Sequence, residues 1–257
     1  MSDLPSLHNW ETTRDNLHRA AMVLGKIRSL LVKPMPFDEH RAIKVAPQGL
    51  TTGLLLPSGN EFVLNFNTSI IEYFSGGNIE MFSVSLEGQS PASLMTSLIS
   101  QMRTVRFASA LTDLPTDTAP FVLNPAQAVD YGEVLNLVAE AMARFRDSLS
   151  GTMSPLLLGS EVFDLSFTWY AGENEHPQIR FGFAPCGHGI DTPHLYVVAQ
   201  PPLKNLVVEA LPAPTRWVET GEFTGAVIDY ADLQAANVPH AMIQTVFGGI
   251  FQLMQSG

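Results

Sequence analysis

Charged residues are scarce in this sequence, and most of those present are acidic. Asp, Glu, Lys and Arg make up 15% of the 257 residues, and the formal net charge is −11. The chain has no run of Lys or Arg, whereas nucleic-acid phosphates and anionic lipid surfaces both attract clustered basic side chains. We therefore expect neither a nucleic-acid partner nor a membrane partner.

Cysteine and long apolar runs are also missing. Cys186 is the only cysteine, so the chain cannot form an internal disulfide, which fits a reducing compartment. The N-terminus lacks the basic and apolar segments of a signal peptide. No apolar run approaches the roughly 20 residues that span a bilayer. These absences favour a cytoplasmic protein.

The familiar catalytic motifs are absent as well. The sequence has no Walker motif, no dinucleotide-binding glycine pattern, no HExxH and no GxSxG. Residues 185–194 combine Cys186, His188, Asp191 and His194, but Cys-x-His places two ligands too close together for an ordinary zinc site. We interpret this segment as a glycine-rich hairpin loop, and we expect no metal and no cofactor.

The best-defined element that the sequence predicts is a helix over Trp10–Leu31. Its apolar and small residues recur every three or four positions and form one stripe, which indicates burial against a sheet. The members of this stripe are Trp10, Thr13, Leu17, Ala20, Ala21, Leu24, Ile27 and Leu31. Pro34 ends the helix.

A second line on this helix carries Arg14, His18, Met22 and Gly25, and Lys26 lies near the end of the helix. One interpretation is structural: His18 binds a loop carbonyl, Arg14 pairs with a carboxylate, and Gly25 admits a neighbouring side chain. The other is functional: Arg14 and His18, four residues apart and so neighbours on the helix, line a pocket in which His18 changes charge near neutral pH. The sequence leaves both open.

The remaining pattern predicts an α+β fold of two similar halves. Short alternating strands between residues 42 and 86 have connections too short for parallel crossovers, so they form an antiparallel meander, and a helix follows at Ser90-Pro91. After a linker over 111–129, a helix starting at the Asp130-x-x-Glu133 pattern, further strands and a C-terminal helix repeat that order. We predict an N-terminal half over 1–110 and a C-terminal half over 130–257, related by a pseudo-twofold duplication.

One later strand presents a polar face. Phe163, Leu165 and Phe167 point to one side, so Asp164 and Ser166 share the other. That face is either exposed to solvent or the wall of a cleft.

Several short blocks resemble an uncharacterised bacterial family, number 5996 in the domain-of-unknown-function series. The blocks are Trp10–Asp15, Leu17-His18, Gly25–Arg28, Gly49–Thr52, Ser154-Pro155, Gly159-Ser160, Phe163–Leu165, Gly182-Phe183 with Pro185, and Tyr196 with Pro201. The resemblance implies one family-length unit and brings no activity. His18, Lys26, Thr51, Ser154 and Asp164 are polar residues within these blocks, whereas Cys186 and His188 stand where glycines are usual.

Two functions follow as hypotheses. In the first, a small polar or anionic molecule binds in a cleft between the halves, and the protein is an enzyme or a binding protein. There His18 and Asp164 are the catalytic candidates, and Arg14, Lys26, Thr51 and Ser154 bind the ligand. In the second, the chain is a non-enzymatic interaction protein that forms a homodimer through the small Gly248-Gly249 pair on its last helix.

Overall fold

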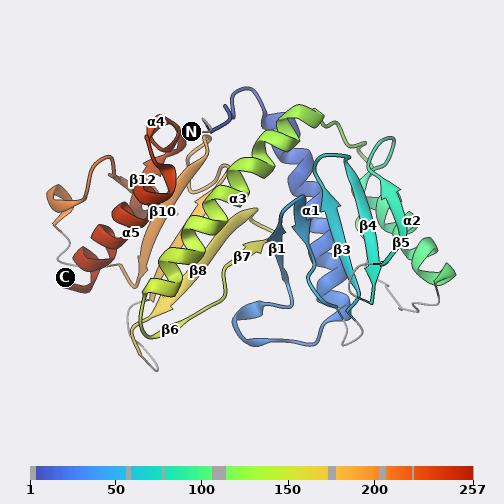
Figure 1. Cartoon of the computed structure of the whole chain (residues 1–257), viewed down its shortest axis with the longest axis horizontal. Coiled ribbons are helices and arrows are strands. Elements are labelled where there is room, and N and C mark those ends of the chain that lie inside the picture. The colour runs from blue at the N-terminus through green and yellow to red at the C-terminus, as the bar shows by residue number, and fades with distance from the viewer. Residues whose placement is uncertain are drawn as a thin grey trace. The chain divides into compact units, whose positions relative to one another are not determined.

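The computed structural model shows an antiparallel α+β protein. It describes residues 4–55, 59–76, 79–105, 114–172, 178–202, 207–221 and 223–256. Within these ranges the chain forms five α-helices and twelve β-strands (Figure 1), and the strand pairings of the two sheets described below are antiparallel, which confirms the predicted class. None of the helices in the described ranges is both long and apolar enough to cross a membrane.

The chain divides into two compact units. The first unit consists of Leu7–Glu133 with Leu158–Glu161, and the second of Met1–Ser6, Val134–Leu157 and Val162–Gly257. The boundary inside the long helix α3 (Pro125–Ser148) falls after Glu133, close to the expected start of the C-terminal half at residue 130. The order helix, meander, helix occurs in both parts of the chain, and their duplication stays a prediction.

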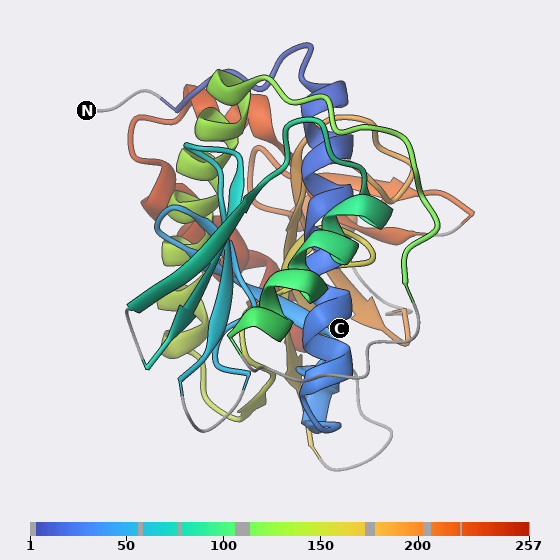
Figure 2. The same cartoon turned by 90° about the vertical axis from the view of Figure 1, so that its right-hand side faces the viewer.

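The first unit is a sheet with two helices packed on it. Its strands lie in the order β7 (Leu157–Gly159), β1 (Ala42–Ala46), β2 (Gly49–Thr51), β3 (Glu61–Asn65), β4 (Ile70–Ser75) and β5 (Ile79–Ser85). Helix α1 (Glu11–Leu31) contacts β1 and β3, and α2 (Pro91–Thr104) contacts β5. The two helices also contact each other (Figure 2), so they cover the same face of the sheet.

The apolar stripe predicted for α1 is buried except at its last residue, Leu31, which is partly exposed. Trp10, Leu17, Ala20, Ala21, Leu24 and Ile27 are each at most 1% exposed. Burying one such large apolar side chain contributes about 1.5–3 kcal/mol, so this stripe fixes the helix on the sheet. Arg28 is buried as well. Two hydrogen bonds offset the cost of burying its charge, since Nε donates to the Glu39 carbonyl at 2.9 Å and Nη1 to the Thr52 carbonyl.

The second unit is a sheet covered by helices on the face that carries its phenylalanines. Its strands lie in the order β11 (Arg216–Glu219), β12 (Thr224–Asp229), β10 (His194–Gln200), β9 (Gln178–Ala184) and β8 (Asp164–Tyr170), and β6 (Thr152–Met153) also pairs with β8. Phe181 of β9 stacks on Phe167 of β8, and both lie against Phe145 of α3. Phe247 of α5 (Pro239–Ser256) completes this cluster, and the short α4 (Tyr230–Ala235) joins β12 to α5.

The start of α3 corrects one prediction. The helix begins at Pro125, not near Asp130. Asn124 caps it, because its Oδ1 accepts a hydrogen bond from the Ala126 N–H at 3.1 Å, and proline at the first helical position needs no donor. The last part of the predicted linker is therefore helix. The first part, residues 111–113, lies outside the described residues.

Candidate functional site

A hollow of about 480 Å³ lies beside α1 in the first unit. We call it the α1 hollow. Its lining combines basic, acidic, hydroxyl and apolar side chains: Arg19, Met22, Val23, Gly25, Lys26, Ser29, Arg41, Pro91, Leu114, Pro115, Thr116, Asp117, Ser160 and Glu161. A volume of this size fits a small metabolite.

Gly25 allows the wall of this hollow to approach the helix. A Cβ atom at Gly25 would lie 2.0 Å from Ser160 Oγ and 2.4 Å from Ser160 Cβ, closer than atoms can approach. Ser160 in turn donates its hydroxyl hydrogen to the Arg41 carbonyl at 3.1 Å. The cost of a glycine inside α1 is thus offset by close packing, as the structural interpretation of Gly25 predicts.

His18 holds the same wall. Its Nε2 lies 3.1 Å from the Glu161 carbonyl, which can only accept, so Nε2 carries the proton. Burial lowers the pKa of His18, so the neutral ring is favoured at pH 7. Arg14, one turn earlier, pairs with the neighbouring Asp15 at 2.8 Å. His18 thus binds a loop carbonyl and Arg14 a carboxylate, as the structural interpretation predicts. A catalytic role for His18 stays a prediction.

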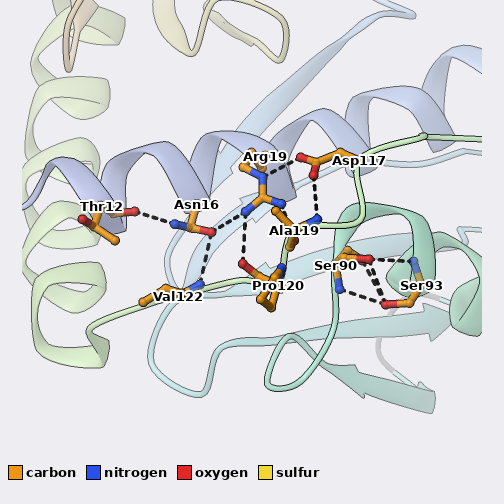
Figure 3. A network of polar contacts seen from close by, with 9 residues as sticks. All are labelled: Thr12, Asn16, Arg19, Ser90, Ser93, Asp117, Ala119, Pro120 and Val122. Carbon is orange, nitrogen blue, oxygen red and sulfur yellow. Dashed lines mark hydrogen bonds and ion pairs between the residues drawn. The ribbon is translucent and has the colours of Figure 1, made fainter.

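The opposite wall is fastened to α1 by Arg19 (Figure 3). The guanidinium Nε donates to Asp117 Oδ2 at 2.7 Å, and the other nitrogens donate to the carbonyls of Ala119 and Pro120. Asn16 adds a bond, because its Oδ1 accepts from the Val122 N–H at 3.1 Å. The segment 114–122, expected to be a linker, is therefore held along the helix and forms part of the hollow.

Three cations line the hollow: Arg19, Arg41 and Lys26. Arg19 is engaged in the network just described. Arg41 makes an exposed ion pair with Glu161 at 3.2 Å, and such pairs contribute little. Lys26 projects from α1 into the same hollow. Of the six residues named from the sequence, Lys26 thus lines the hollow and His18 supports its wall.

Thr51 and Ser154 hold local structure. Thr51 lies on β2, where its hydroxyl donates to Glu61 Oε2 and accepts from the Gly53 N–H, both at 2.9 Å. Ser154 belongs to the second unit, where its hydroxyl accepts from the Thr168 N–H at 2.8 Å and donates to the Pro155 carbonyl at 3.2 Å. These bonds occupy both hydroxyls, and their roles in ligand binding stay predictions.

Asp164 is the centre of a buried polar cluster on the second unit's sheet. It is 3% exposed, and its Oδ2 accepts from Nη2 of Arg180 at 3.1 Å and from the hydroxyl of Tyr196. Ser166 contacts the same guanidinium at 2.9 Å. Burial, followed by the charge of Asp164, raises the pKa of Tyr196 well above its usual value. The phenol therefore stays protonated and donates to the carboxylate.

Gly182 makes the contact between Tyr196 and Asp164 possible. It pairs with Ser166 of β8 on one side and with Tyr196 of β10 on the other. A Cβ at Gly182 would lie 2.2 Å from Cζ of Tyr196, so the tyrosine ring lies across the glycine to reach Asp164. A glycine in mid-strand often marks such a close approach.

Two histidines extend the cluster. His188 and Gly189 both have positive φ, and Gly187 and Ile190 exchange two backbone hydrogen bonds around them, which makes a tight type I′ hairpin turn. The turn places the His188 ring 4.3 Å from the ring of Tyr196 and 4.6 Å from that of Phe223, measured between centroids. His188 Nδ1 lies 3.1 Å from His194 Nε2, and His194 Nδ1 lies 2.8 Å from the Thr192 carbonyl. The predicted hairpin loop is confirmed.

The sequence pointed to Asp164 and placed His188 and His194 in the hairpin loop, but it did not indicate that Arg180 and Tyr196 contact Asp164. Arg180 and Gly182 occupy alternate positions of β9, and Tyr196 pairs with Gly182 from β10. The glycine between Phe181 and Phe183 was the available signal. In the described ranges, no group of three or more His, Cys, Asp or Glu residues could hold a metal ion.

The buried His194 predicts a pH-dependent stability. Burial lowers its pKa to about 4, against about 6.5 in an unfolded chain. As the pH falls below about 6.5, the unfolded chain binds a proton that the folded protein does not, so the free energy of unfolding drops. We expect a loss of about 2 kcal/mol between about pH 6.5 and about pH 5, measurable by urea unfolding.

The control is His194→Gln, which removes the titrating group and keeps an acceptor. His18 and His188, whose pKa values burial also lowers, remain in the variant. The variant should therefore lose stability less steeply over the same range. An unchanged slope would show that His194 is not the buried neutral base described here.

One protein family matches residues 2–180, and its description is "Family of unknown function (DUF5996)". The chain belongs to this family. The match covers α1, the α1 hollow, Asp164 and Arg180, and it ends before Gly182, His188, His194 and Tyr196. No curated protein and no solved structure matches the chain.

Proposed function

We propose that the protein binds a small polar or anionic molecule in the α1 hollow. The observation that carries this proposal is that Lys26 and Arg41 both line one hollow of about 480 Å³, which also has an apolar side. Ligand sites of this size combine apolar walls with a few convergent polar groups. The hollow has both.

Each part of the lining has a distinct task. Lys26 and Arg41 bind the anionic group of the ligand. The hydroxyls of Ser29 and Ser160 donate to the carbonyls of Lys26 and Arg41, so towards the ligand they accept hydrogen bonds. Met22 and Leu114 contact its apolar part. His18 acts on the ligand indirectly, because its bond to the Glu161 carbonyl holds that wall in place.

Lys26→Gln should weaken binding at least tenfold, because removing one charge-assisted hydrogen bond costs about 1.5 kcal/mol or more. The measurement is a thermal-shift screen of small carboxylates and phosphates, followed by calorimetric titration of any ligand found. Lys33→Gln is the matched control, since Lys33 is exposed and is not among the residues that line the hollow. Equal affinity in both variants, or no ligand in the screen, would contradict the proposal.

Homodimer formation through α5 is the alternative proposal. A Cβ at Gly248 would meet no atom within 4 Å, so this part of the helix leaves room for a partner. Gly249 is instead explained within the chain, because its Cβ would lie 3.1 Å from Cγ of Pro212. Light scattering at high protein concentration tests the alternative, and a strict monomer would rule it out.

A further inference from the structure

We infer that the polar cluster of the second unit is a separate acid–base site, in which Nε2 of His188 accepts a proton from a small acid whose anionic group binds Arg180. This site shares no residue with the α1 hollow, so it goes beyond the proposed function and stands or falls independently of it.

The hydrogen-bond chain of the two histidines fixes which nitrogen is basic. A carbonyl can only accept, so His194 donates its Nδ1–H to Thr192. A neutral His194 then has its lone pair on Nε2, and His188 must donate its own Nδ1–H to that nitrogen. The lone pair of neutral His188 is left on Nε2. This is the arrangement of a general base oriented by a second group.

The neutral state of both rings is favoured near pH 7. Burial lowers the pKa of His188 and lowers that of His194 to about 4. The charged and titratable groups facing them are Asp164 on β8, Arg180 on β9, Tyr196 on β10, and Asp229 with Arg216 on β12 and β11. Asp164 and Asp229 favour protonation, whereas Arg180 and Arg216 oppose it.

The surroundings of His188 suit proton transfer. Tyr196 and Phe223 pack against the ring and fix its position. The turn that carries the ring holds His188 at φ 59°, a conformation uncommon for residues other than glycine. A backbone held there at a cost in energy is found at functional sites more often than elsewhere.

Arg180 supplies the binding group. Its side chain is 44% exposed, and the hydrogen bonds described for it use Nε and Nη2, to Asp164 and Ser166. We therefore assign Nη1 as the nitrogen that donates to a carboxylate or phosphate oxygen of the ligand. Asp164 holds the guanidinium in place and faces His188, where it stabilises the imidazolium that forms.

The step is a simple proton transfer. Nε2 of His188 takes the proton of an acidic O–H on the ligand, and the electron pair of the broken bond stays on the ligand oxygen. The imidazolium then carries the positive charge between Asp164 and His194. Dihydrogen phosphate, which is present in inorganic phosphate near pH 7, has both an anionic oxygen for Arg180 and an acidic O–H for His188, so inorganic phosphate is the probe that we would use.

Two measurements on the full-length protein test the inference. Nitrogen-15 NMR of the imidazoles should show His188 protonated at Nδ1 and bare at Nε2 near pH 7, and His194→Leu should shift it towards the Nε2–H form. Diethyl pyrocarbonate, which modifies bare imidazole nitrogens, should modify His188 at Nε2 at least as fast as the exposed His8. Inorganic phosphate should slow the reaction at His188 at least threefold and leave His8 unchanged.

The variants separate the site from simple folding effects. Arg180→Gln, checked for folding by circular dichroism, should abolish the protection by phosphate while His188 keeps its Nδ1–H form. Lys26→Gln should leave the protection intact, because the α1 hollow is a different site. An Nε2–H tautomer in the wild type, a His188 that does not react, or protection that survives Arg180→Gln would each overturn the inference.

Discussion

Gly182→Ala should lower the free energy of unfolding by about 4 kcal/mol, because two costs add. The new methyl group would lie 2.2 Å from Cζ of Tyr196, so the ring must move off its place over the strand. Overpacking of a core costs about 1–3 kcal/mol. Displacing the ring also breaks the bond from its hydroxyl to the buried carboxylate of Asp164, and a hydrogen bond to a charged group contributes about 1.5–3 kcal/mol.

Urea unfolding followed by tyrosine and tryptophan fluorescence measures this loss. Tyr196→Phe keeps the ring and removes the hydroxyl, so it should show only the hydrogen-bond part of the cost. Gly221→Ala is the matched control, because a Cβ there meets no atom within 4 Å and should change stability by at most about 0.5 kcal/mol. A Gly182→Ala protein as stable as the wild type would show that Tyr196 does not lie over the glycine.

Gly25→Ala should destabilise the protein by about 2 kcal/mol, although alanine is the better helix former. Inside a helix this substitution gains about 1 kcal/mol when the new methyl group has room. Gly248 of α5 has that room, so Gly248→Ala should stabilise the protein by up to that amount. At Gly25 the methyl group would overlap Ser160 Oγ, which forces the 158–161 segment away from α1.

The partner residue provides the decisive control. Ser160→Gly alone should cost about 1 kcal/mol, since it removes the hydroxyl bond to the Arg41 carbonyl. In the double variant the alanine no longer meets a side chain, so the two changes together should cost less than Gly25→Ala alone. Purely additive losses in chemical denaturation would mean that the clash between these two residues is absent.

The helices and strands can be predicted from local sequence patterns, whereas the two sites depend on contacts between residues that are distant in the sequence. The stripe of α1 predicts its burial because a helix repeats every 3.6 residues whatever its partners are. Arg28, at the edge of that stripe, is buried by carbonyls of Glu39 and Thr52, which no periodicity identifies. The start of α3 differs from the prediction because Asn124 caps the helix at Pro125, so that Asp130 and Glu133 lie inside it.

The two sites differ in how far the sequence could predict them. Lys26 and His18 stand on one helix, so their neighbourhood was predictable, whereas Arg41 and Glu161 reach the hollow only through tertiary folding. Asp164 was predictable as a polar residue on a strand face. Its contact with Tyr196 depends on the register that sets Ser166, Gly182 and Tyr196 side by side, and register is a property of the folded sheet.

Neither unit is a continuous stretch of chain, which has a consequence for synthesis on the ribosome. β1 pairs with β7 at Ala42–Gly159 and Ile43–Leu158, and β7 is synthesised more than 100 residues later. The first unit therefore stays incomplete until residue 161 has left the exit tunnel. The N-terminal segment of the second unit cannot reach its final position until residues 230–234 have been synthesised. Tyr230 donates a hydrogen bond to the Pro5 carbonyl, and Gln234 donates one to the Leu4 carbonyl. We therefore expect nascent chains arrested before residue 158 to remain sensitive to protease in their N-terminal half.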